Sequence, residues 1–428
     1  MRDPVGLPSR RTGRLTLADP VPWMVGLFVV SFVLQRISVP GISIPVTVPI
    51  ALLWVGAALV WSVVTIDSRR LLLWLAASGV SGALVLPQLM VLARPLVSFN
   101  SWALWTVIWL PIVVRFKANT LTNYLRALRV VAQVGLAIAV LSIAFMTLQL
   151  LGTPYHDWVA DLVPSQLLVH DYVNTYPITY GSEIYKSNGW IALEPSFLSF
   201  ALGVCLVAAL VVRMSVATVV VLVAGLLSTV AGSGVALVGI YLVGLLVTGR
   251  LAGLRRYAIP TGLLALAFGF SMLGQSLFGR ISEVAVPRSS TSLRAIEPYV
   301  QLWPYWISDP IGVLIGQGAG SSARTISGLS IDGLLVPSVA KVLFDYGLIG
   351  GSGLLAVMVV TYLRSPEPIF AFSIAVSMFV LQSASQPLVI LALMMFAFWA
   401  PAPRRVWARR APPLVLAGTR PRRLFDPA

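Results

Sequence analysis

The side chains best suited to chemistry lie in one stretch, between Arg280 and Asp332. Four cations and four carboxylates lie there, with four large aromatic residues among them. Guanidinium groups bind phosphate oxygens in a bidentate manner, and aromatic rings offer flat apolar faces to a sugar or a lipid tail. This mixture suits an amphiphile with a phosphorylated, glycosylated head. Aromatic residues are also common at any membrane interface, so simple anchoring stays open as the alternative.

Several residues of this stretch are predicted to bind the substrate, because each offers a positive charge, an aromatic ring or a glycine backbone. They are Arg280, Arg288, Arg324, Tyr299, Trp303, Gly318 and Gly320. The two glycines belong to the sequence GQGAG, which has no strand–helix–strand context and so does not predict a dinucleotide site. A backbone nest near a phosphate and a plain flexible turn both fit them.

Glu194 is the strongest single candidate for a catalytic residue. The segment YKSNGWIALEPSFLSF places this carboxylate just inside an otherwise apolar helix, next to Pro195. Proline is tolerated in a first helical turn, and the positive end of the helix dipole favours a carboxylate there. An ionisable residue at membrane depth is by default a functional hypothesis. A helix-start cap, or a partner for Lys186, is the structural alternative.

Lys341 and Asp345 are spaced four residues apart on a predicted helix, so they share one helix face. At the edge of a membrane neither charge is expected to lack a partner, and a mutual ion pair is the structural interpretation. Lys341 could also reach a pyrophosphate from that position.

A metal site is not expected. The two histidines, His156 and His170, are too far apart in the chain to form a helical ligand pair, and Cys205 is the only cysteine. Metal sites in proteins usually need several such ligands at close spacing.

The composition of the chain indicates a membrane protein. Of its 428 residues 58% are hydrophobic and only 11% charged, and the mean hydropathy is +0.89. A soluble domain is about 45–50% apolar and about 25% charged, so a soluble enzyme and a disordered chain are excluded. The net charge of +15 is expected to reflect cations retained on the cytoplasmic side rather than nucleic-acid binding.

The sequence predicts an all-α polytopic protein with about twelve transmembrane helices in a single integral membrane domain, 1–428. The expected spans are 21–35, 46–66, 71–93, 99–114, 128–152, 191–212, 215–231, 233–249, 257–277, 337–361, 369–384 and 386–400. Most lysines and arginines face the cytoplasm if both termini lie there. Two long loops, 153–190 and 278–336, are then external and contain short helices, and a basic tail, 401–428, is cytoplasmic.

Four sequence features follow one another along the chain. Two long external loops precede the sixth and tenth spans, and GWIALEPSFLSF opens the sixth. Arg294 lies early in the second loop, before DPIGVLIGQGAG, and KVLFDYGLIGG follows. In this order they resemble the bacterial O-antigen polymerase/ligase superfamily, membrane glycosyltransferases of the GT-C type that use undecaprenyl-pyrophosphate-linked glycans. The resemblance covers roughly 180–365 in detail and the remainder by topology.

Two positions depart from the pattern of that superfamily. Its ligase branch carries a histidine in the second loop, where this chain has Asp332 in the approximate place. This difference counts against a ligase of the lipid A core. The superfamily also tends to have an arginine shortly before G-x-x-x-EP, whereas the nearest cation here is Lys186. Lysine binds phosphate as a point charge, so Lys186 is predicted to bind the substrate in place of that arginine.

The resemblance implies a polysaccharide polymerase in the bacterial cytoplasmic membrane, with its active site facing the exterior. Arg294, aided by other arginines and Lys341, would hold the pyrophosphate, and Glu194 or, second, Asp332 would accept a proton from the attacking sugar hydroxyl. The expected partners are the lipid-linked oligosaccharide, membrane lipid and, as a candidate, a chain-length regulator protein; no cofactor, metal or nucleic acid is expected. The alternatives are a ligase-like transferase to a different acceptor and a flippase for a polyisoprenoid lipid.

Overall fold

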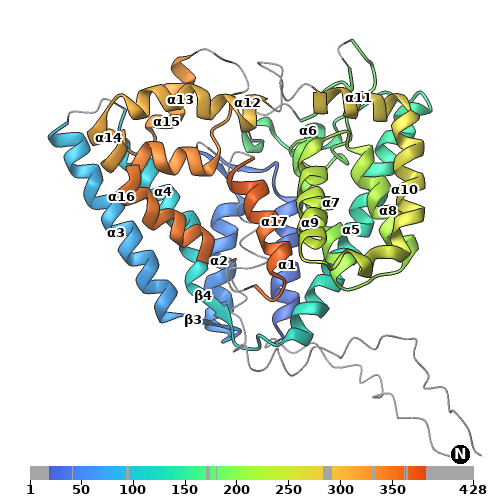
Figure 1. Cartoon of the computed structure of the whole chain (residues 1–428), viewed down its shortest axis with the longest axis horizontal. Helices are drawn as coiled ribbons and strands as arrows, with labels where there is room; N and C mark the ends of the chain where they lie inside the picture. The colour runs from blue at the N-terminus through green and yellow to red at the C-terminus, as the bar shows by residue number, and fades with distance from the viewer. Residues whose placement is uncertain are drawn as a thin grey trace, which may run out of the picture.

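The computed structural model describes residues 19–381 except 41, 93–95, 170–173, 180, 283–291, 330, 332–333, 361 and 363–364. Over these residues the chain is mostly helical, as predicted, and its long helices run side by side in one bundle (Figure 1). The last expected span, 386–400, and the tail 401–428 lie outside the described residues.

The long helices fall on the predicted apolar runs. They are α1 (Pro20–Val33), α2 (Thr47–Val60), α3 (Ser68–Met90), α4 (Phe99–Trp109), α5 (Leu121–Leu150), α7 (Pro195–Val211), α8 (Val216–Ser228), α9 (Gly232–Val247), α10 (Arg255–Phe270), α16 (Ser338–Val360) and α17 (Pro368–Phe379). Capping side chains explain where several of these helices begin. The carboxylate of Asp67 accepts from the amides of Arg69 and Arg70, and the hydroxyl of Thr120 accepts from the amide of Asn123.

Three helices, α3, α5 and α16, are long and apolar enough to cross a membrane. The other apolar helices have 10–17 residues. At 1.5 Å per residue a 14-residue helix such as α1 is about 21 Å long, which is shorter than the hydrocarbon core of about 30 Å. The described part of the chain is therefore compatible with a membrane protein. Three helices suffice by length and composition, and one of them, α16, is interrupted at Gly347, whose backbone is not helical.

Three expected spans are shorter in the structure than predicted. In the span 99–114, α4 ends at Trp109 and is followed by a 3-10 turn (Leu110–Val113) and the start of a strand at Val114. Helix α10 ends at Phe270, and the hydroxyl of Ser271 then accepts from the amide of Gly274, which starts a separate helix, α11 (Met272–Ser282). Helix α2 ends at Val60, and the chain continues into a strand, β3 (Val64–Ile66), that pairs with β4 (Val114–Phe116) in antiparallel register. Apolar content alone predicted one continuous helix in each place, because it does not distinguish an apolar strand or a capped break from a helix.

Helix α7 forms the centre of one half of the bundle and is buried almost throughout its length. It crosses α9 at two glycines, where a Cβ atom on Gly203 would lie 2.9 Å from the Cα of Gly234. The Ser199 hydroxyl donates to the carbonyl of Ala231 at 2.9 Å. Small residues therefore let these two helices approach closely, as is common in membrane bundles.

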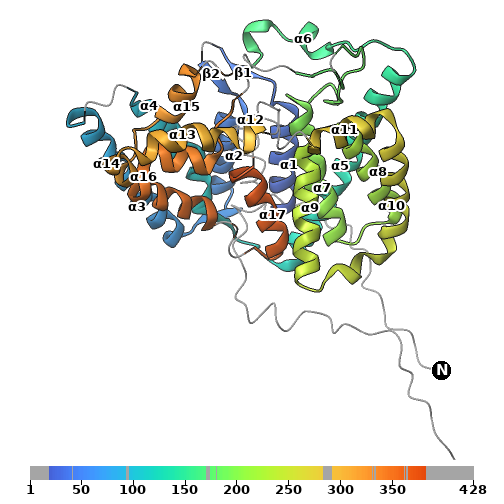
Figure 2. The same ribbon diagram turned by 45° about the horizontal axis from the view of Figure 1, so that its top comes forward.

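The short helices gather at one end of the bundle (Figures 1 and 2). They are α6 (Trp158–Leu162) in the first long loop and α12 (Ser292–Ala295), α13 (Glu297–Ile307), α14 (Pro310–Ile315) and α15 (Ser321–Gly328) in the second. Strands β1 (Ser38–Val39) and β2 (Ile42–Pro45) lie at this end too, whereas β3 and β4 lie at the opposite end. The prediction of short helices within both loops is confirmed.

Candidate functional site

The first long loop delivers Glu194 to the start of α7 through a tightly held turn. The Ser187 hydroxyl donates to the Ser142 carbonyl of α5 at 3.1 Å, and the side chain of Asn188 accepts from the Trp190 amide at 3.0 Å. Gly189 and Trp190 both have positive φ, +59° and +61°, which is unusual for a bulky residue such as Trp190. The backbone just before Glu194 is thus fixed by side chains from its own loop and from α5.

The Glu194 carboxylate is nearly buried, with a relative exposure of 5%. Glu194 directly precedes Pro195 at the N-terminus of α7, but its side chain accepts no hydrogen bond from the amides of this helix. Instead Oε2 accepts from the Ser196 hydroxyl at 2.9 Å and from Nη2 of Arg294 at 3.2 Å. The interpretation of this carboxylate as a side-chain cap is therefore wrong, and its observed ionic partner lies 100 residues further along the chain.

Arg294 reaches Glu194 from the second long loop. It lies on α12, whose neighbour Leu293 packs into a small core shared with α13, α15 and α16. The amide of Leu335 also donates to the carbonyl of Leu293 at 3.3 Å. The two residues singled out in the sequence as base and phosphate ligand thus meet where the second loop touches α7. Over the described residues Glu194 is the hydrogen-bonding partner of the Arg294 side chain, which is 27% exposed.

Tyr176 joins this pair to Lys186. Tyr176 and Lys186 face each other across a short hairpin, where the Lys186 amide donates to the Tyr176 carbonyl at 2.9 Å. Nζ of Lys186 lies 5.7 Å from the centre of the Tyr176 ring. Burial raises the pKa of Tyr176, the negative charge of Glu194 raises it further, and Arg294 opposes both. Lys186, predicted as a phosphate ligand, is itself 4% exposed, while the tyrosine above it is 39% exposed.

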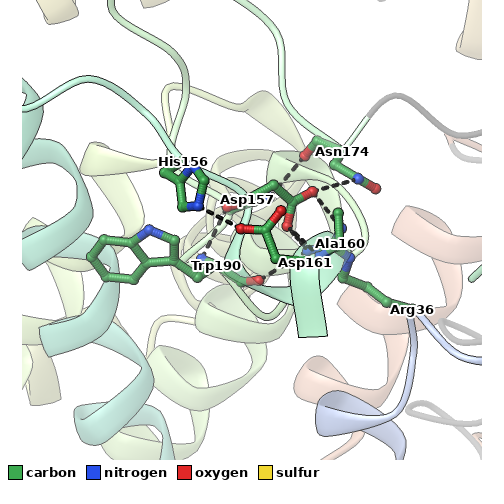
Figure 3. A network of polar contacts seen from close by, with 8 residues as sticks. Arg36, His156, Asp157, Ala160, Asp161, Asn174 and Trp190 are labelled. Atoms are coloured by element: carbon green, nitrogen blue, oxygen red, sulfur yellow. Dashed lines mark hydrogen bonds and ion pairs between the residues drawn. The ribbon is translucent and has the colours of Figure 1, made fainter. Parts of the chain in front are cut away.

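A second arginine–carboxylate pair anchors the first loop (Figure 3). Arg36, just beyond α1, donates to both oxygens of Asp157, at 2.7 Å and 2.6 Å, and to the carbonyl of Trp190 at 3.1 Å. Asn174 donates to the same carboxylate at 2.9 Å. Burial alone would raise the pKa of Asp157, but its bonds to Arg36 and to its other donors lower the pKa below the ordinary value. Because Trp190 lies four residues before Glu194, this network helps to position the candidate site.

Lys341 and Asp345 form the predicted ion pair on α16, with Nζ 2.7 Å from Oδ2. The carboxylate is completely buried and also accepts from the amides of Gly320 and Ser322, at 2.9 Å and 2.8 Å, and from the hydroxyl of Ser321. Asp345 thereby holds the start of α15. The Lys341 side chain keeps 19% exposure at the edge of this arrangement.

The GQGAG segment is packed against α16 through its backbone. The amides of Gln317 and Gly318 donate to the carbonyls of Phe344 and Asp345. Gly316 and Gly347 both have positive φ and lie so close that a Cβ on Gly347 would be 2.4 Å from the Gly316 amide nitrogen. Of the two interpretations of this segment, the structure shows a tight turn whose amides bond to protein, with the Gly318 and Gly320 amides both donating to Asp345.

The remaining predicted residues have different positions. Arg324 is exposed on α15, and Trp303 is 54% exposed on α13. The Tyr299 hydroxyl donates to the carbonyl of Val380 at 3.3 Å. Arg280 belongs to α11, but its side chain is not described, and Arg288 and Asp332 lie outside the described residues. In the described part of the chain no hydrogen bond or ion pair joins Arg324 or Trp303 to the Glu194–Arg294 pair.

The arrangement provides a nearly buried carboxylate beside a partly exposed guanidinium. A carboxylate of this kind can accept a proton, and the arginine can bind an anionic oxygen with its remaining N–H groups. Three contributors escaped sequence analysis: Ser196, Tyr176 and the Arg36–Asp157 pair. Ser196 follows Glu194 by two residues and was open to inference as a local hydroxyl donor, whereas partners more than a hundred residues apart leave no local pattern.

Among the residues that the structure describes, no group of three or more histidine, cysteine, aspartate or glutamate side chains is placed to hold a metal ion. Comparison of the chain with protein-family models, curated proteins and solved structures yields no match. The function of the site must therefore be argued from its own residues.

Proposed function

We propose that this chain is a polysaccharide polymerase, a metal-independent glycosyltransferase that uses a polyprenyl-pyrophosphate-linked donor. The observation that carries the proposal is the contact between Glu194, at the start of α7, and Arg294, in the second loop, two residues that the sequence motifs had marked separately. The acceptor is the sugar end of a second lipid-linked repeat unit. This assignment rests on the motif resemblance for the substrate and on the geometry for the chemistry.

The proposed reaction uses the pair as an acid–base and anion-binding unit. The acceptor hydroxyl oxygen forms a bond to the anomeric carbon, the bond from that carbon to the pyrophosphate oxygen breaks, and the hydroxyl proton passes to Glu194. Arg294 binds the departing pyrophosphate and stabilises its developing charge. Since a bound pyrophosphate competes for Arg294, donor binding weakens the ion pair and frees the carboxylate to act as base.

The proposed membrane arrangement follows the charges at the two ends of the bundle. Basic residues Arg69, Arg115 and Arg256 lie on α3, β4 and α10, and the first two are at the β3–β4 end. The Glu194–Arg294 pair lies at the opposite end, beside α12. Under the positive-inside rule the β3–β4 end is cytoplasmic and the candidate site is external. We propose twelve spans in a bacterial cytoplasmic membrane, with the apolar helices of 10–17 residues among them.

Reconstitution with a lipid-linked repeat unit tests the proposal. The full chain in phospholipid vesicles is given an undecaprenyl-pyrophosphate oligosaccharide, and the products are separated by size. A ladder of lengthened glycans is expected. One fixed addition to another acceptor would instead identify a ligase, and unchanged substrate on the opposite leaflet would identify a flippase; either result overturns the polymerase.

Arginine variants then test the site. Arg294→Ala is expected to lower polymer formation at least 100-fold, in line with the loss of one charge-stabilising donor in an active site. Arg69→Ala removes an exposed arginine at the β3–β4 end and is the matched control, with activity unchanged. Full polymerisation by Arg294→Ala would refute the role given to Arg294.

A further inference from the structure

Helix α13 presents an apolar stripe that no described residue covers. Along α13 and the following α14, large apolar residues recur at spacings of three and four, which places those of each helix on one face. They are Ile296 (41% exposed), Val300 (56%), Trp303 (54%), Ile307 (51%), Ile311 (52%) and Leu314 (51%). A run of this kind on a surface marks an interaction site rather than a chance exposure.

A different face of α13 is packed against protein, so the direction of the stripe is fixed. Leu302 is 3% exposed and forms a core with Phe344 of α16 and Ile326 of α15, and Tyr299 and Trp306 pack on that core. The helix therefore cannot turn its apolar stripe inward without losing this core.

The position of α13 and α14 brings the stripe close to other exposed apolar side chains. Helix α13 lies across the end of the bundle rather than along it in both views (Figures 1 and 2). The side chain of Gln88, near the end of α3, donates to the carbonyl of Ile315 at 2.5 Å, which places the end of α14 level with the last turn of α3. Exposed there are Leu89 (42%) and Met90 (82%). The end of α14 thus lies beside the end of a helix of spanning length that also exposes apolar side chains.

The chemistry of the stripe fits lipid. Between Pro298 and Ile315 the only charged residue is Asp309, and its carboxylate accepts from the side chain of Gln317. Trp303 and Trp306 contact each other edge to face at 5.4 Å, and exposed Tyr305 adjoins them. Tryptophan and tyrosine are enriched where the hydrocarbon of a bilayer meets its headgroups, and an amphipathic helix in that layer lies in the plane of the membrane.

We propose that α13 and α14 are seated in the outer leaflet of the membrane, with the stripe from Ile296 to Leu314 in contact with phospholipid acyl chains. This inference goes beyond the proposed transferase function and does not require it. Its consequence for the site is geometric, because α12 and Arg294 directly precede α13. The guanidinium lies within a few residues of a lipid contact, so a ligand held by Arg294 can keep its hydrocarbon part in the leaflet.

Site-directed spin labelling tests the contact of α13 and α14 with lipid, and it needs no substrate. Cys205 is completely buried, so a Cys205→Ala background allows one cysteine at a time to be labelled. The test positions are Val300, Trp303 and Ile307, and the matched controls are Ser327 and Arg324, which are exposed on α15. Each labelled chain is reconstituted in phosphatidylcholine vesicles, and collision with oxygen, which partitions into lipid, is compared with collision with a water-soluble nickel chelate.

Labels on the stripe are expected to collide several times more often with oxygen than with the chelate, and labels on α15 to show the reverse. A stripe as accessible to the chelate as Ser327 would overturn the proposal, because α13 would then face water. Protection of the stripe from both reagents would also overturn it, since that result indicates protein rather than lipid on this face. All labelled positions are exposed, so the substitutions leave the core contacts of α13 in place.

Discussion

Two arginine–carboxylate pairs at the same end of the molecule differ in how completely they are enclosed. Arg36 bonds both oxygens of Asp157 and a main-chain carbonyl, and its side chain is 3% exposed. Arg294 meets Glu194 through one nitrogen at 3.2 Å and is 27% exposed. Chemically similar pairs thus differ in their capacity to bind anything else. The enclosed pair holds the fold of the first loop, and the open pair retains donors for a ligand.

The largest difference between the pairs is expected in activity. Glu194→Gln keeps the shape and hydrogen-bonding ability of the side chain but removes its capacity to take a proton. We expect polymer formation to fall by about 100- to 10,000-fold, the usual contribution of a general base. Asp157→Asn, the matched variant of the enclosed pair, should retain far more activity. Rates from reconstituted vesicles at equal protein content measure both, and an active Glu194→Gln enzyme would exclude Glu194 as the base.

Stability should show the opposite order. Asp157→Ala leaves the buried Arg36 guanidinium without its carboxylate, which is expected to cost about 3–5 kcal/mol. Glu194→Ala leaves Arg294 unpaired but partly exposed to solvent, and a cost of about 1 kcal/mol is expected. Denaturant unfolding in a mild detergent compares the two variants. Equal losses would show that the difference in enclosure has no energetic consequence.

Acid should weaken the enclosed pair. The pKa of Asp157 is lowered in the native protein from its ordinary value of 3.8, so its pairing stabilises the fold above about pH 4 and this contribution is lost as the pH falls through the lower native pKa. Asp157→Asn should be less stable at neutral pH and should lack this part of the acid dependence. Unfolding midpoints of the two proteins from neutral pH down to acid measure the difference. Parallel curves would contradict the assignment.

A third pair, Lys341 with Asp345, extends the comparison to a carboxylate that has several other donors. Lys341→Met removes the cation from Asp345, but that carboxylate keeps two amide donors and one hydroxyl. We expect a loss of about 1.5–3 kcal/mol, the usual value of a hydrogen bond to a charged group, because the three remaining donors still compensate the buried charge of Asp345. Asp345→Ala, which removes every one of these contacts, is the comparison variant and should be clearly less stable. A Lys341 variant as damaging as Asp345→Ala would show that the lysine is the main partner.

The sequence predicted what is encoded locally. Apolar runs located the long helices, and the carboxylate before Pro195 marked the start of α7 because both signals lie within a few neighbouring residues. The ends of helices were predicted less accurately than their positions. The hydroxyl of Ser271 separates α10 from α11, and the chain after Val60 forms a strand that pairs with β4. Such ends depend on one cap or on a distant partner, neither of which changes the average hydropathy of a segment.

The contacts of the candidate site were predictable only in part. Glu194 and Arg294 were chosen separately for their chemistry, and the sequence offered no means of pairing residues 100 positions apart. The ion pair of Lys341 with Asp345 followed from helical spacing, but the bonds from Asp345 to the start of α15 did not. Asp157 and Arg36 carry no local signal of their pairing, because they lie 121 residues apart.

The burial of α7 restricts where the site can adapt to a ligand. This helix contacts protein on nearly every side and meets α9 at Gly203 and Gly234 without space for another methyl group. A carboxylate at its tip has a fixed location, so any change of shape needed for a different sugar falls on the hairpin of Tyr176 and on the four-residue helix of Arg294. Specificity should therefore be easier to redesign in those two segments than along α7.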